Sequence, residues 1–246
     1  MKELLFNYSE KNFIVSGASS GIGYQTMIEL LESGARVFAI ARNINELEKL
    51  KSRYEDRLFI SNNDIRNVSD IKFDIDLFKS FFGKFDGLVY CAGIDKITSL
   101  KVYDEKVVKD IMDINFFAAV NIIQLFTKKA YSKNEASIVL CSSISSKIGV
   151  AGQFAYSASK ASMNIFSKSI AKEISKRKLR INTVCLGRVK TKMNNSFEIS
   201  EDIVLRYLLG IGNTDDVSGV ILFLLSNRAK WITGADLIID GGFLSN

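Results

Sequence analysis

Seven short apolar runs alternate with longer amphipathic stretches from one end of this chain to the other. The runs cover residues 12–16, 36–41, 58–61, 87–91, 136–142, 180–185 and 236–240. Segments such as VFAIA and SIVLC are apolar at nearly every position, which is typical of parallel strands covered on both faces. The stretches 104–131 and 154–176 have the periodicity of amphipathic helices. This order of elements predicts an α/β fold with a parallel sheet and right-handed crossovers.

A single domain accounts for the chain, because its 246 residues contain no internal repeat, low-complexity tract or linker. We therefore expect one domain over 1–246. The segment 190–209 departs from the alternation, since it follows a predicted strand, begins polar and becomes weakly helical. Beside a binding site such a segment often acts as a substrate lid, and an ordinary surface excursion is the alternative.

The formal net charge of +6 raises the question of nucleic-acid binding. The basic residues are dispersed, and the densest cluster, KEISKRKLR at 172–180, lies at a predicted helix end where cations complement the helix dipole. We expect no nucleic-acid partner. No apolar run reaches the ~20 residues that span a bilayer, and the N-terminal stretch has no small-residue cleavage site. We therefore expect no membrane partner and a cytoplasmic location.

Three cysteines, Cys91, Cys141 and Cys185, are far apart in the sequence, and each ends an apolar run. We expect buried, reduced thiols, which suit a cytoplasm. Their spacing is not that of a metal site, so we expect no metal ion.

Glycines gather where the first predicted strand meets the first predicted helix. The segment FIVSGASSGIGYQTM places Gly17, Gly21 and Gly23 at this junction. Glycine lets a backbone turn tightly and approach a pyrophosphate closely, while the N-terminus of the helix offers N–H groups to the phosphates. The spacing G-x-x-x-G-x-G differs from the common dinucleotide fingerprint. A plain tight turn is the alternative, but the position in the first β–α junction favours a dinucleotide site.

The end of the second predicted strand indicates which dinucleotide binds. An Asp or Glu often stands there and repels a 2′-phosphate. This chain has Ala41 followed by Arg42, and a guanidinium can pair with that phosphate. We expect NADP(H) to be preferred, with NAD(H) possible; a solvated Arg42 is the alternative. Asp64 and Ile65 follow the third strand, where they could contact the adenine, although Asp64 could equally cap a helix.

The segment YSASK suggests proton chemistry in a chain without histidine. Tyr156 and Lys160 are four residues apart and therefore share a helical face. A nearby ammonium, together with a positive nicotinamide, would lower the pKa of the phenol, so that Tyr156 could exchange a proton with a carbonyl or alcohol oxygen. Ser143, which lies 13 residues earlier at a strand end, could hydrogen-bond the same oxygen.

In combination these motifs resemble those of the short-chain dehydrogenase/reductase family over essentially the whole chain. SGASSGIG is similar to the family's T-G-x-x-x-G-x-G loop, with Ser16 in place of threonine. YCAG resembles N-N-A-G, DIN contains the family's helix-bend asparagine, LGRVKT resembles P-G-x-I-x-T, and WITGADLIIDGG resembles the C-terminal strand and turn. Cys91 replaces an asparagine that braces the fourth strand, and Leu186 replaces the proline, so the geometry of these two loops is in question.

The resemblance implies a Rossmann-type doubly wound sheet of about seven strands in the order 3-2-1-4-5-6-7, with helices on both faces. It implies four catalytic residues, Asn115, Ser143, Tyr156 and Lys160, with Asn115 either anchoring a water that links the lysine to solvent or bending its helix. It also implies a cofactor site formed by Gly17, Ser19, Ser20, Gly21, Ile22, Gly23, Arg42, Asn43, Asp64, Ile65, Cys91, Ala92, Gly93, Tyr156, Lys160, Gly187, Val189 and Thr191.

The expected activity is hydride transfer between NADP(H) and a carbonyl/alcohol pair. The substrate could be a 3-oxoacyl thioester on a carrier protein, a small ketone or a sugar; a non-catalytic protein that senses the cofactor or acts as a scaffold is the alternative. Relatives pair their two long helices across a two-fold axis, so we expect a dimer or tetramer. Apolar side chains that suggest such an interface, or that belong equally to the core, are Phe116, Phe117, Val120, Ile123, Phe154, Ile165 and Phe166. The lid would add apolar lining through Met193, Phe197 and Ile199.

Overall fold

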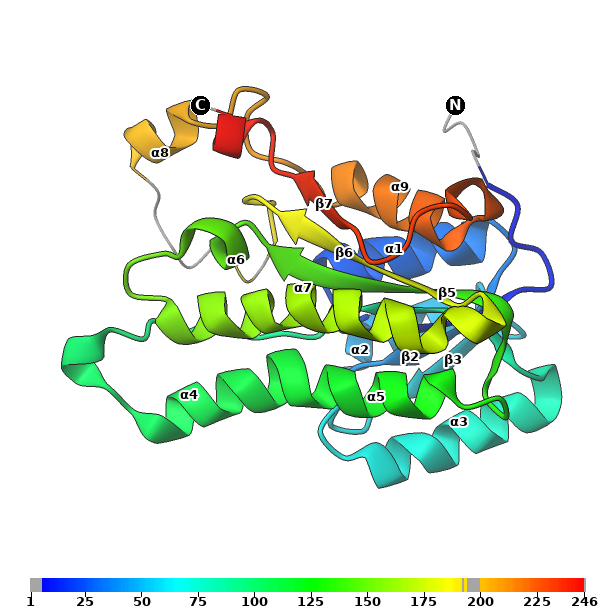
Figure 1. The fold of residues 1–246 in the computed structure, drawn as a ribbon. Helices are drawn as coiled ribbons and strands as arrows, with labels where there is room; N and C mark the ends of the chain where they lie inside the picture. Colours follow the sequence, from blue (N-terminus) through cyan, green and yellow to red (C-terminus); the bar gives the residue numbers. More distant parts are fainter. Residues whose placement is uncertain (1–5, 192, 194–199, 246) are drawn as a thin grey trace.

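A seven-stranded parallel sheet forms the centre of the molecule (Figure 1). The computed structural model describes residues 6–191, 193 and 200–245. The strand order is β3-β2-β1-β4-β5-β6-β7, as predicted. The strands are β1 Asn12–Ser16, β2 Arg36–Ile40, β3 Leu58–Ser61, β4 Phe85–Tyr90, β5 Ser132–Ser143, β6 Arg180–Leu186 and β7 Asp236–Ile239.

Three predicted strand ends, Ala41, Cys91 and Asp240, lie one residue beyond the strands. At these points the chain leaves the sheet to form the loops at its carboxyl edge. The backbone N–H of Cys91 still donates to Ser16 O, at 3.3 Å. In open parallel sheets, ligands bind at this carboxyl edge, at the point where the connections from two neighbouring strands lead to opposite faces of the sheet.

Helices cover both faces of the sheet (Figure 1). In the part of the chain that the structure describes, they are α1 Gly21–Glu32, α2 Asn45–Lys51, α3 Val68–Phe82, α4 Glu105–Met112, α5 Ala118–Thr127, α6 Ser145–Ile148, α7 Phe154–Ile174, α8 Glu201–Leu205 and α9 Thr214–Leu225. Helices α1 and α9 pack on one face, and α3, α5 and α7 on the other. Along β1, Phe13 and Val15 pack in the core on the side of α1 and α9, and Ile14 packs in the core on the side of α3, α5 and α7. This double coverage explains why the strands are apolar at nearly every position.

The predicted helix 104–131 is observed, but it contains a wider turn. A π-helical turn, Asp113–Phe117, joins α4 to α5. The combined segment Glu105–Thr127 meets the length and hydropathy criteria for a membrane span. Half of its most apolar window is buried in the fold, and its residues Ile122 and Phe126 belong to the core, so we interpret it as a core helix.

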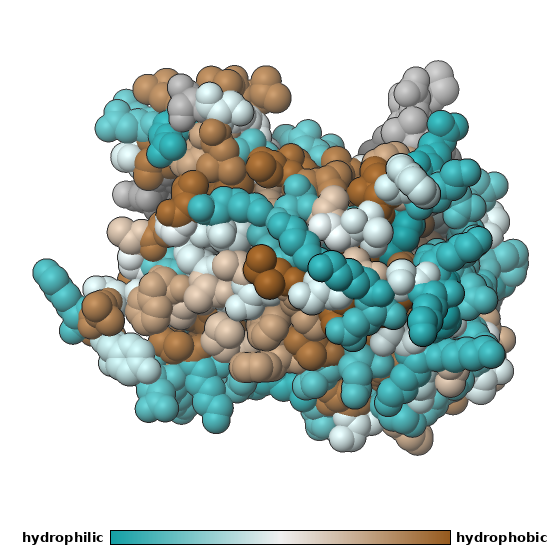
Figure 2. Space-filling view, in the orientation of Figure 1, coloured by the Kyte–Doolittle hydropathy of each residue, from teal (hydrophilic) through white to brown (hydrophobic). Residues whose placement is uncertain are grey.

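Some of the side chains proposed for a subunit interface belong to the core instead. Ile123 is 2 % exposed and packs in the core against the sheet, which matches the core alternative and not the interface. Phe117 and Ile165 are 51 % and 64 % exposed. Figure 2 shows apolar side chains gathered over α4 and the adjoining part of α7. Association with a second copy through this face stays a prediction.

Candidate active site

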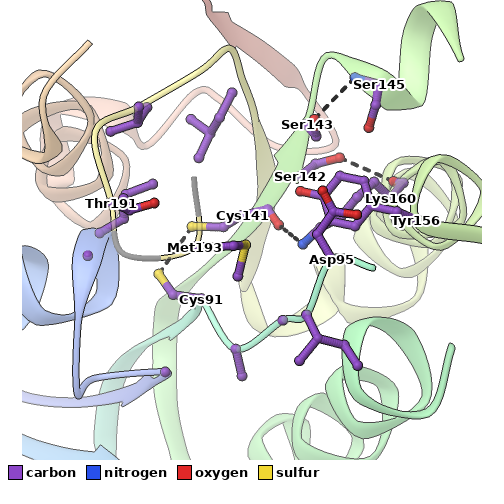
Figure 3. A pocket seen from close by; sticks show the side chains of 18 of the residues that line it. Cys91, Asp95, Cys141, Ser142, Ser143, Ser145, Tyr156, Lys160, Thr191 and Met193 are labelled. Atoms are coloured by element: carbon purple, nitrogen blue, oxygen red, sulfur yellow. Dashed lines mark hydrogen bonds between the residues drawn. The ribbon is translucent and has the colours of Figure 1, made fainter. Parts of the chain in front are cut away.

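A cavity of about 750 Å³ opens at the carboxyl edge of the sheet (Figure 3). All 18 residues predicted to bind the cofactor, Tyr156 and Lys160 among them, contribute to its wall, as does Ser143. These residues come from segments far apart in the sequence, and the parallel strands bring them together by ending at one edge. Asn115 does not line the cavity and lies behind its wall.

The glycine loop fits closely between neighbouring backbones. Gly17 has φ +68°, and a Cβ there would lie 2.8 Å from the backbone N of Ala92. A Cβ on Gly23 would lie 2.4 Å from Gly17 O. Helix α1 begins at Gly21 with no acidic residue in its first turn, and its N-cap residue Ser20 makes no side-chain cap. The N–H groups of this turn therefore suit an anion, and the loop fits the pyrophosphate of a dinucleotide.

The loop that follows strand β6 closes over the same region. A Cβ on Gly21 would lie 3.1 Å from Thr191 Cγ2, and one on Gly187 would lie 2.7 Å from Asp240 Cα. The N–H of Gly187 donates to Ile239 O at 2.9 Å. The loop after Leu186, the last residue of β6, is therefore held against the end of strand β7.

The far end of the cavity contains Arg42 and Asp64. Arg66 binds Asp64 through both carboxylate oxygens, with Nε–Oδ1 at 3.0 Å and Nη2–Oδ2 at 2.7 Å. These hydrogen bonds lower the pKa of Asp64 to about 2, and the charge of Arg42 contributes to the lowering. The helix-capping alternative for Asp64 is wrong, because Asn67 occupies the N-cap of α3. Asp64 is therefore an ionised carboxylate beside Arg42.

Ser143, Tyr156 and Lys160 lie together at the opposite end (Figure 3). Ser143 ends β5, and its Oγ accepts from the backbone N of Ser145 at 3.1 Å. Tyr156 lies in the first turn of α7, and Lys160 follows one turn later. The Lys160 ammonium donates to Cys141 O at 2.8 Å and lies 5.6 Å from the centre of the Tyr156 ring.

The expected lowering of the Tyr156 pKa by Lys160 is not found in the protein alone. Burial raises the pKa of Tyr156 well above that of a free phenol, and the charge of Asp95 raises it further. A hydrogen bond with Ser143 lowers it, but by less than burial raises it. Burial also lowers the pKa of Lys160. Because burial outweighs the hydrogen bond with Ser143, Tyr156 stays protonated at neutral pH in the protein alone.

Asn115 is fully buried and makes three hydrogen bonds to the protein. Its Oδ1 accepts from Ile94 N at 2.8 Å, and its Nδ2 donates to Ile94 O and to Ser159 Oγ, both at 3.0 Å. The residue therefore ties the π-helical turn to the loop after β4 and to α7. A Cβ on Gly93 would lie 3.3 Å from Asn115 Oδ1 and 3.5 Å from Lys160 Nζ, so both side chains flank this loop. The contacts match the helix-bending alternative, and a role in water binding stays a prediction.

Two polar residues of the cavity wall, Asp95 and Gln153, were missed at the sequence level. Gln153 Nε2 donates to Asp95 Oδ2 at 2.6 Å, while the buried Asp95 Oδ1 has no hydrogen-bond partner among the described residues. Burial raises the pKa of Asp95 to about 6. The available signals were that Asp95 directly follows the YCAG-I segment and that Gln153 lies three positions before the start of YSASK.

The predicted lid is only partly described. Met193, Ile203 and Tyr207 contribute to the cavity wall, and the Tyr207 hydroxyl accepts from the backbone N of Arg188 at 3.0 Å. Phe197 and Ile199 lie outside the described residues. A metal ion was not expected, and no cluster of three or more His, Cys, Asp or Glu occurs in the ranges 6–191, 193 and 200–245.

A glycine loop and a Ser–Tyr–Lys wall on a parallel sheet together define a dinucleotide-binding α/β protein of the oxidoreductase class. A sequence profile of the short chain dehydrogenase family matches residues 11–202. The 3-oxoacyl-[acyl-carrier-protein] reductases FabG of Staphylococcus aureus and Thermotoga maritima are 30% and 31% identical to this chain. Each alignment covers 94% of the chain, and 97% and 96% of those proteins, respectively.

Solved structures share the fold. A short-chain dehydrogenase/reductase from Serratia marcescens superposes with a TM-score of 0.89 over 96% of this chain and 98% of its own, at 23% identity. A 4-hydroxyisoleucine dehydrogenase complexed with NADH superposes with a TM-score of 0.87 over 96% of this chain and 99% of its own, at 26% identity. The chain belongs to the short-chain dehydrogenase/reductase family and is an oxidoreductase acting on CH–OH or C=O groups.

Replacing Gly23 with alanine is expected to abolish dinucleotide binding and to destabilise the fold by about 1–3 kcal/mol, because the new Cβ would overlap Gly17 O. Gly219→Ala is the matched control, since Gly219 lies within α9 and its Cβ would meet nothing within 4 Å. The control should be neutral or stabilising by up to about 1 kcal/mol. Thermal unfolding with and without cofactor measures both effects, and unchanged binding by Gly23→Ala would contradict the assignment.

Replacing Asp95 with asparagine is expected to change how stability depends on pH. The pKa of Asp95 is about 6 in the folded protein, above the ordinary 3.8. Ionisation of Asp95 therefore lowers the free energy of unfolding as pH rises towards and through 6. Below the ordinary pKa the carboxyl is protonated in the folded and the unfolded state, so Asp95 does not destabilise the fold there. From about pH 4 to 7.5 the variant should gain up to about 2 kcal/mol relative to wild type.

Glu173→Gln, which alters an exposed carboxylate on α7, serves as the control, and its stability relative to wild type should not change with pH in this way. Melting temperatures across this pH range provide the measurement. A stability difference between Asp95→Asn and wild type that stays constant with pH would contradict the raised pKa.

Proposed function

We propose that this protein is an NADP(H)-dependent oxidoreductase that interconverts a carbonyl and an alcohol, with Tyr156 as the proton donor and acceptor. One observation carries the proposal: Ser143, Tyr156 and Lys160 lie on one wall of a cavity whose other end is the glycine loop. A group bound between these ends would have its reactive part beside the phenol. When bound, the nicotinamide supplies or takes up the hydride.

The protein side chains would handle the oxygen and the proton. Ser143 Oγ accepts from Ser145 N, and the Ser143 hydroxyl that hydrogen-bonds Tyr156 in the protein alone would turn its hydrogen to the substrate oxygen. Tyr156, held neutral by burial, is ready to donate its proton to a carbonyl oxygen, which suits the reductive direction. The Lys160 ammonium is fixed by the Cys141 carbonyl 5.6 Å from the centre of the Tyr156 ring, and stabilisation of the phenolate that results would come from the positive charge of the oxidised nicotinamide.

The residues at the far end of the cavity support a preference for NADP(H). Arg42 is exposed on the cavity wall, two residues after the end of strand β2 and beside the ionised Asp64. Ala41 occupies the position where an acidic residue would repel a 2′-phosphate. A guanidinium in this position can bind the phosphate with charge-assisted hydrogen bonds. The 4-hydroxyisoleucine dehydrogenase neighbour holds NADH, so binding of NAD(H) is the competing outcome.

The substrate end combines apolar side chains with polar ones. Ile97, Ile148, Val150, Met193 and Ile203 contribute the apolar surface, and Asp95 with Gln153 the polar surface. A substrate with an apolar body fits this lining. The FabG relatives are named for a 3-oxoacyl carrier-protein substrate, so a 3-oxoacyl thioester heads the candidates, followed by small ketones and sugars. A non-catalytic role is disfavoured, because a simple binder does not require Tyr156 and Lys160 together on the cavity wall.

Removal of the phenol tests the chemistry. Tyr156→Phe should reduce NADPH-dependent turnover of a responsive carbonyl compound by about 10²–10⁴-fold while NADPH binding changes little. Tyr103→Phe, which alters a 57 % exposed tyrosine, is the control and should retain activity. The assay follows NADPH oxidation across a panel of 3-oxoacyl thioesters, ketones and sugars. Equal rates for Tyr156→Phe and wild type would refute the role of Tyr156, and a wild type that binds NADPH but turns over no compound would favour the non-catalytic alternative.

The choice of cofactor is tested at Arg42. Arg42→Ala should weaken NADPH binding roughly 10- to 100-fold, the loss expected for a charge-assisted phosphate contact, and leave NADH binding nearly unchanged. Arg228→Ala provides a control outside the cavity wall. Fluorescence titrations with the two reduced cofactors provide the dissociation constants. A wild type that binds NADH tenfold more tightly than NADPH would contradict the preference.

A further inference from the structure

We propose that Cys91 and Cys141 form a reversible dithiol–disulfide pair in the wall of the cavity, oxidised by hydroperoxides. Their sulfur atoms are 3.1 Å apart, although the residues are 50 positions apart in the sequence. Strands β4 and β5 pair in parallel with Tyr90 opposite Leu140, so Cys91 and Cys141 are the next opposed residues. Figure 3 shows the two sulfur atoms directed at one another in the cavity that holds Thr191 and Met193.

The backbone geometry permits the bond. Neighbouring strands lie about 4.8 Å apart, within the Cα separation of about 4.4–6.8 Å that disulfides span. The sulfur atoms need only approach from 3.1 Å to about 2.05 Å, without either strand leaving the sheet. Cys185 has a different environment: it is buried, and its sulfur lies 3.5 Å from Asn164 Nδ2. It therefore serves as an internal reference thiol.

The surroundings distinguish the two thiols. The hydrogen bond from Cys91 and the charge of Lys160 lower the pKa of Cys141, while the same bond and burial raise the pKa of Cys91. Cys141 is therefore the nucleophile: its thiolate attacks the hydroperoxide oxygen, which forms a sulfenic acid and releases an alkoxide or hydroxide. Cys91 sulfur then attacks the Cys141 sulfur, and the sulfenic oxygen leaves as water with the Cys91 proton. Two electrons pass from the thiols to the hydroperoxide, and an external thiol reverses the change.

The bond would act on the parts of the site that these cysteines touch. The Cys141 carbonyl accepts the Lys160 ammonium. A Cβ on Gly23 would lie 3.2 Å from Cys91 Cβ, so Cys91 supports the glycine loop directly. Drawing the sulfur atoms together would therefore shift the Cys141 carbonyl that binds Lys160, or the glycine loop beside Cys91. This step rests on the proposed function, and we expect oxidation to weaken NADPH binding at least tenfold and bound NADPH to slow oxidation.

Intact mass and thiol alkylation test the bond itself. After hydrogen peroxide treatment, wild type should lose two hydrogen atoms, retain one alkylatable thiol after unfolding, and yield a peptide linking residues 91 and 141. Dithiothreitol should restore three alkylatable thiols. Cys91→Ser and Cys91→Ala should not form the link, whereas Cys185→Ser should form it as wild type does. A link through Cys185, or oxidation of Cys141 to sulfinic acid with Cys91 still alkylatable, would overturn the proposal.

The effect on the site is read separately by titrating NADPH into oxidised and reduced protein. In Cys185→Ser, which keeps both cysteines of the pair, the oxidised form should bind NADPH at least tenfold more weakly than the reduced form. In Cys91→Ser, which cannot form the bond, the same treatment should not change the affinity for NADPH. This pair of results supports coupling to the site. Equal affinities in the two forms overturn that coupling. Reduced protein that binds no NADPH contradicts the proposed function, while the mass measurement still decides whether the disulfide forms.

Discussion

The hydrogen bond from the Lys160 ammonium to the Cys141 carbonyl joins helix α7 to the end of strand β5, and the rest of the site depends on it. A buried ammonium is costly unless it is hydrogen-bonded, and Lys160 is only 5 % exposed. The carbonyl at the strand end provides the partner, and it thereby fixes the register of α7 against the sheet. Tyr156, one turn earlier on the same helix, is held beside Ser143 as a result. The same carbonyl belongs to one member of the cysteine pair.

The electrostatics of this wall favour a protonated phenol in the protein alone. Burial and the charge of Asp95 both raise the pKa of Tyr156, and the one lowering contribution, a hydrogen bond with Ser143, is smaller than that of burial. A cationic nicotinamide beside the ring would act in the opposite direction. The protein thus provides a proton donor for reduction, and the proton acceptor needed for oxidation depends on the charge of the bound cofactor.

Much of the fold was predictable because its signals are local. Continuous apolar runs identified all seven strands, and the i, i+4 spacing of Tyr156 and Lys160 placed them on one helical face. Contacts that depend on tertiary packing were not predictable in this way. The apolar pattern left open whether Ile123 belongs to an interface or to the core, and packing places it in the core. The partner of Asp64 is Arg66 rather than a helix end. Cys91 and Cys141 looked unrelated because only the β4–β5 register brings them together.

The most direct test of this account is a difference titration of phenolate absorbance between wild type and Tyr156→Phe, with and without NADP⁺. Without cofactor, the Tyr156 signal should stay that of a neutral phenol beyond pH ~10, where a free tyrosine titrates. With NADP⁺ bound, the ionisation of Tyr156 should move to lower pH while the other tyrosines are unaffected. A Tyr156 phenolate already present at neutral pH in the cofactor-free protein would contradict the account.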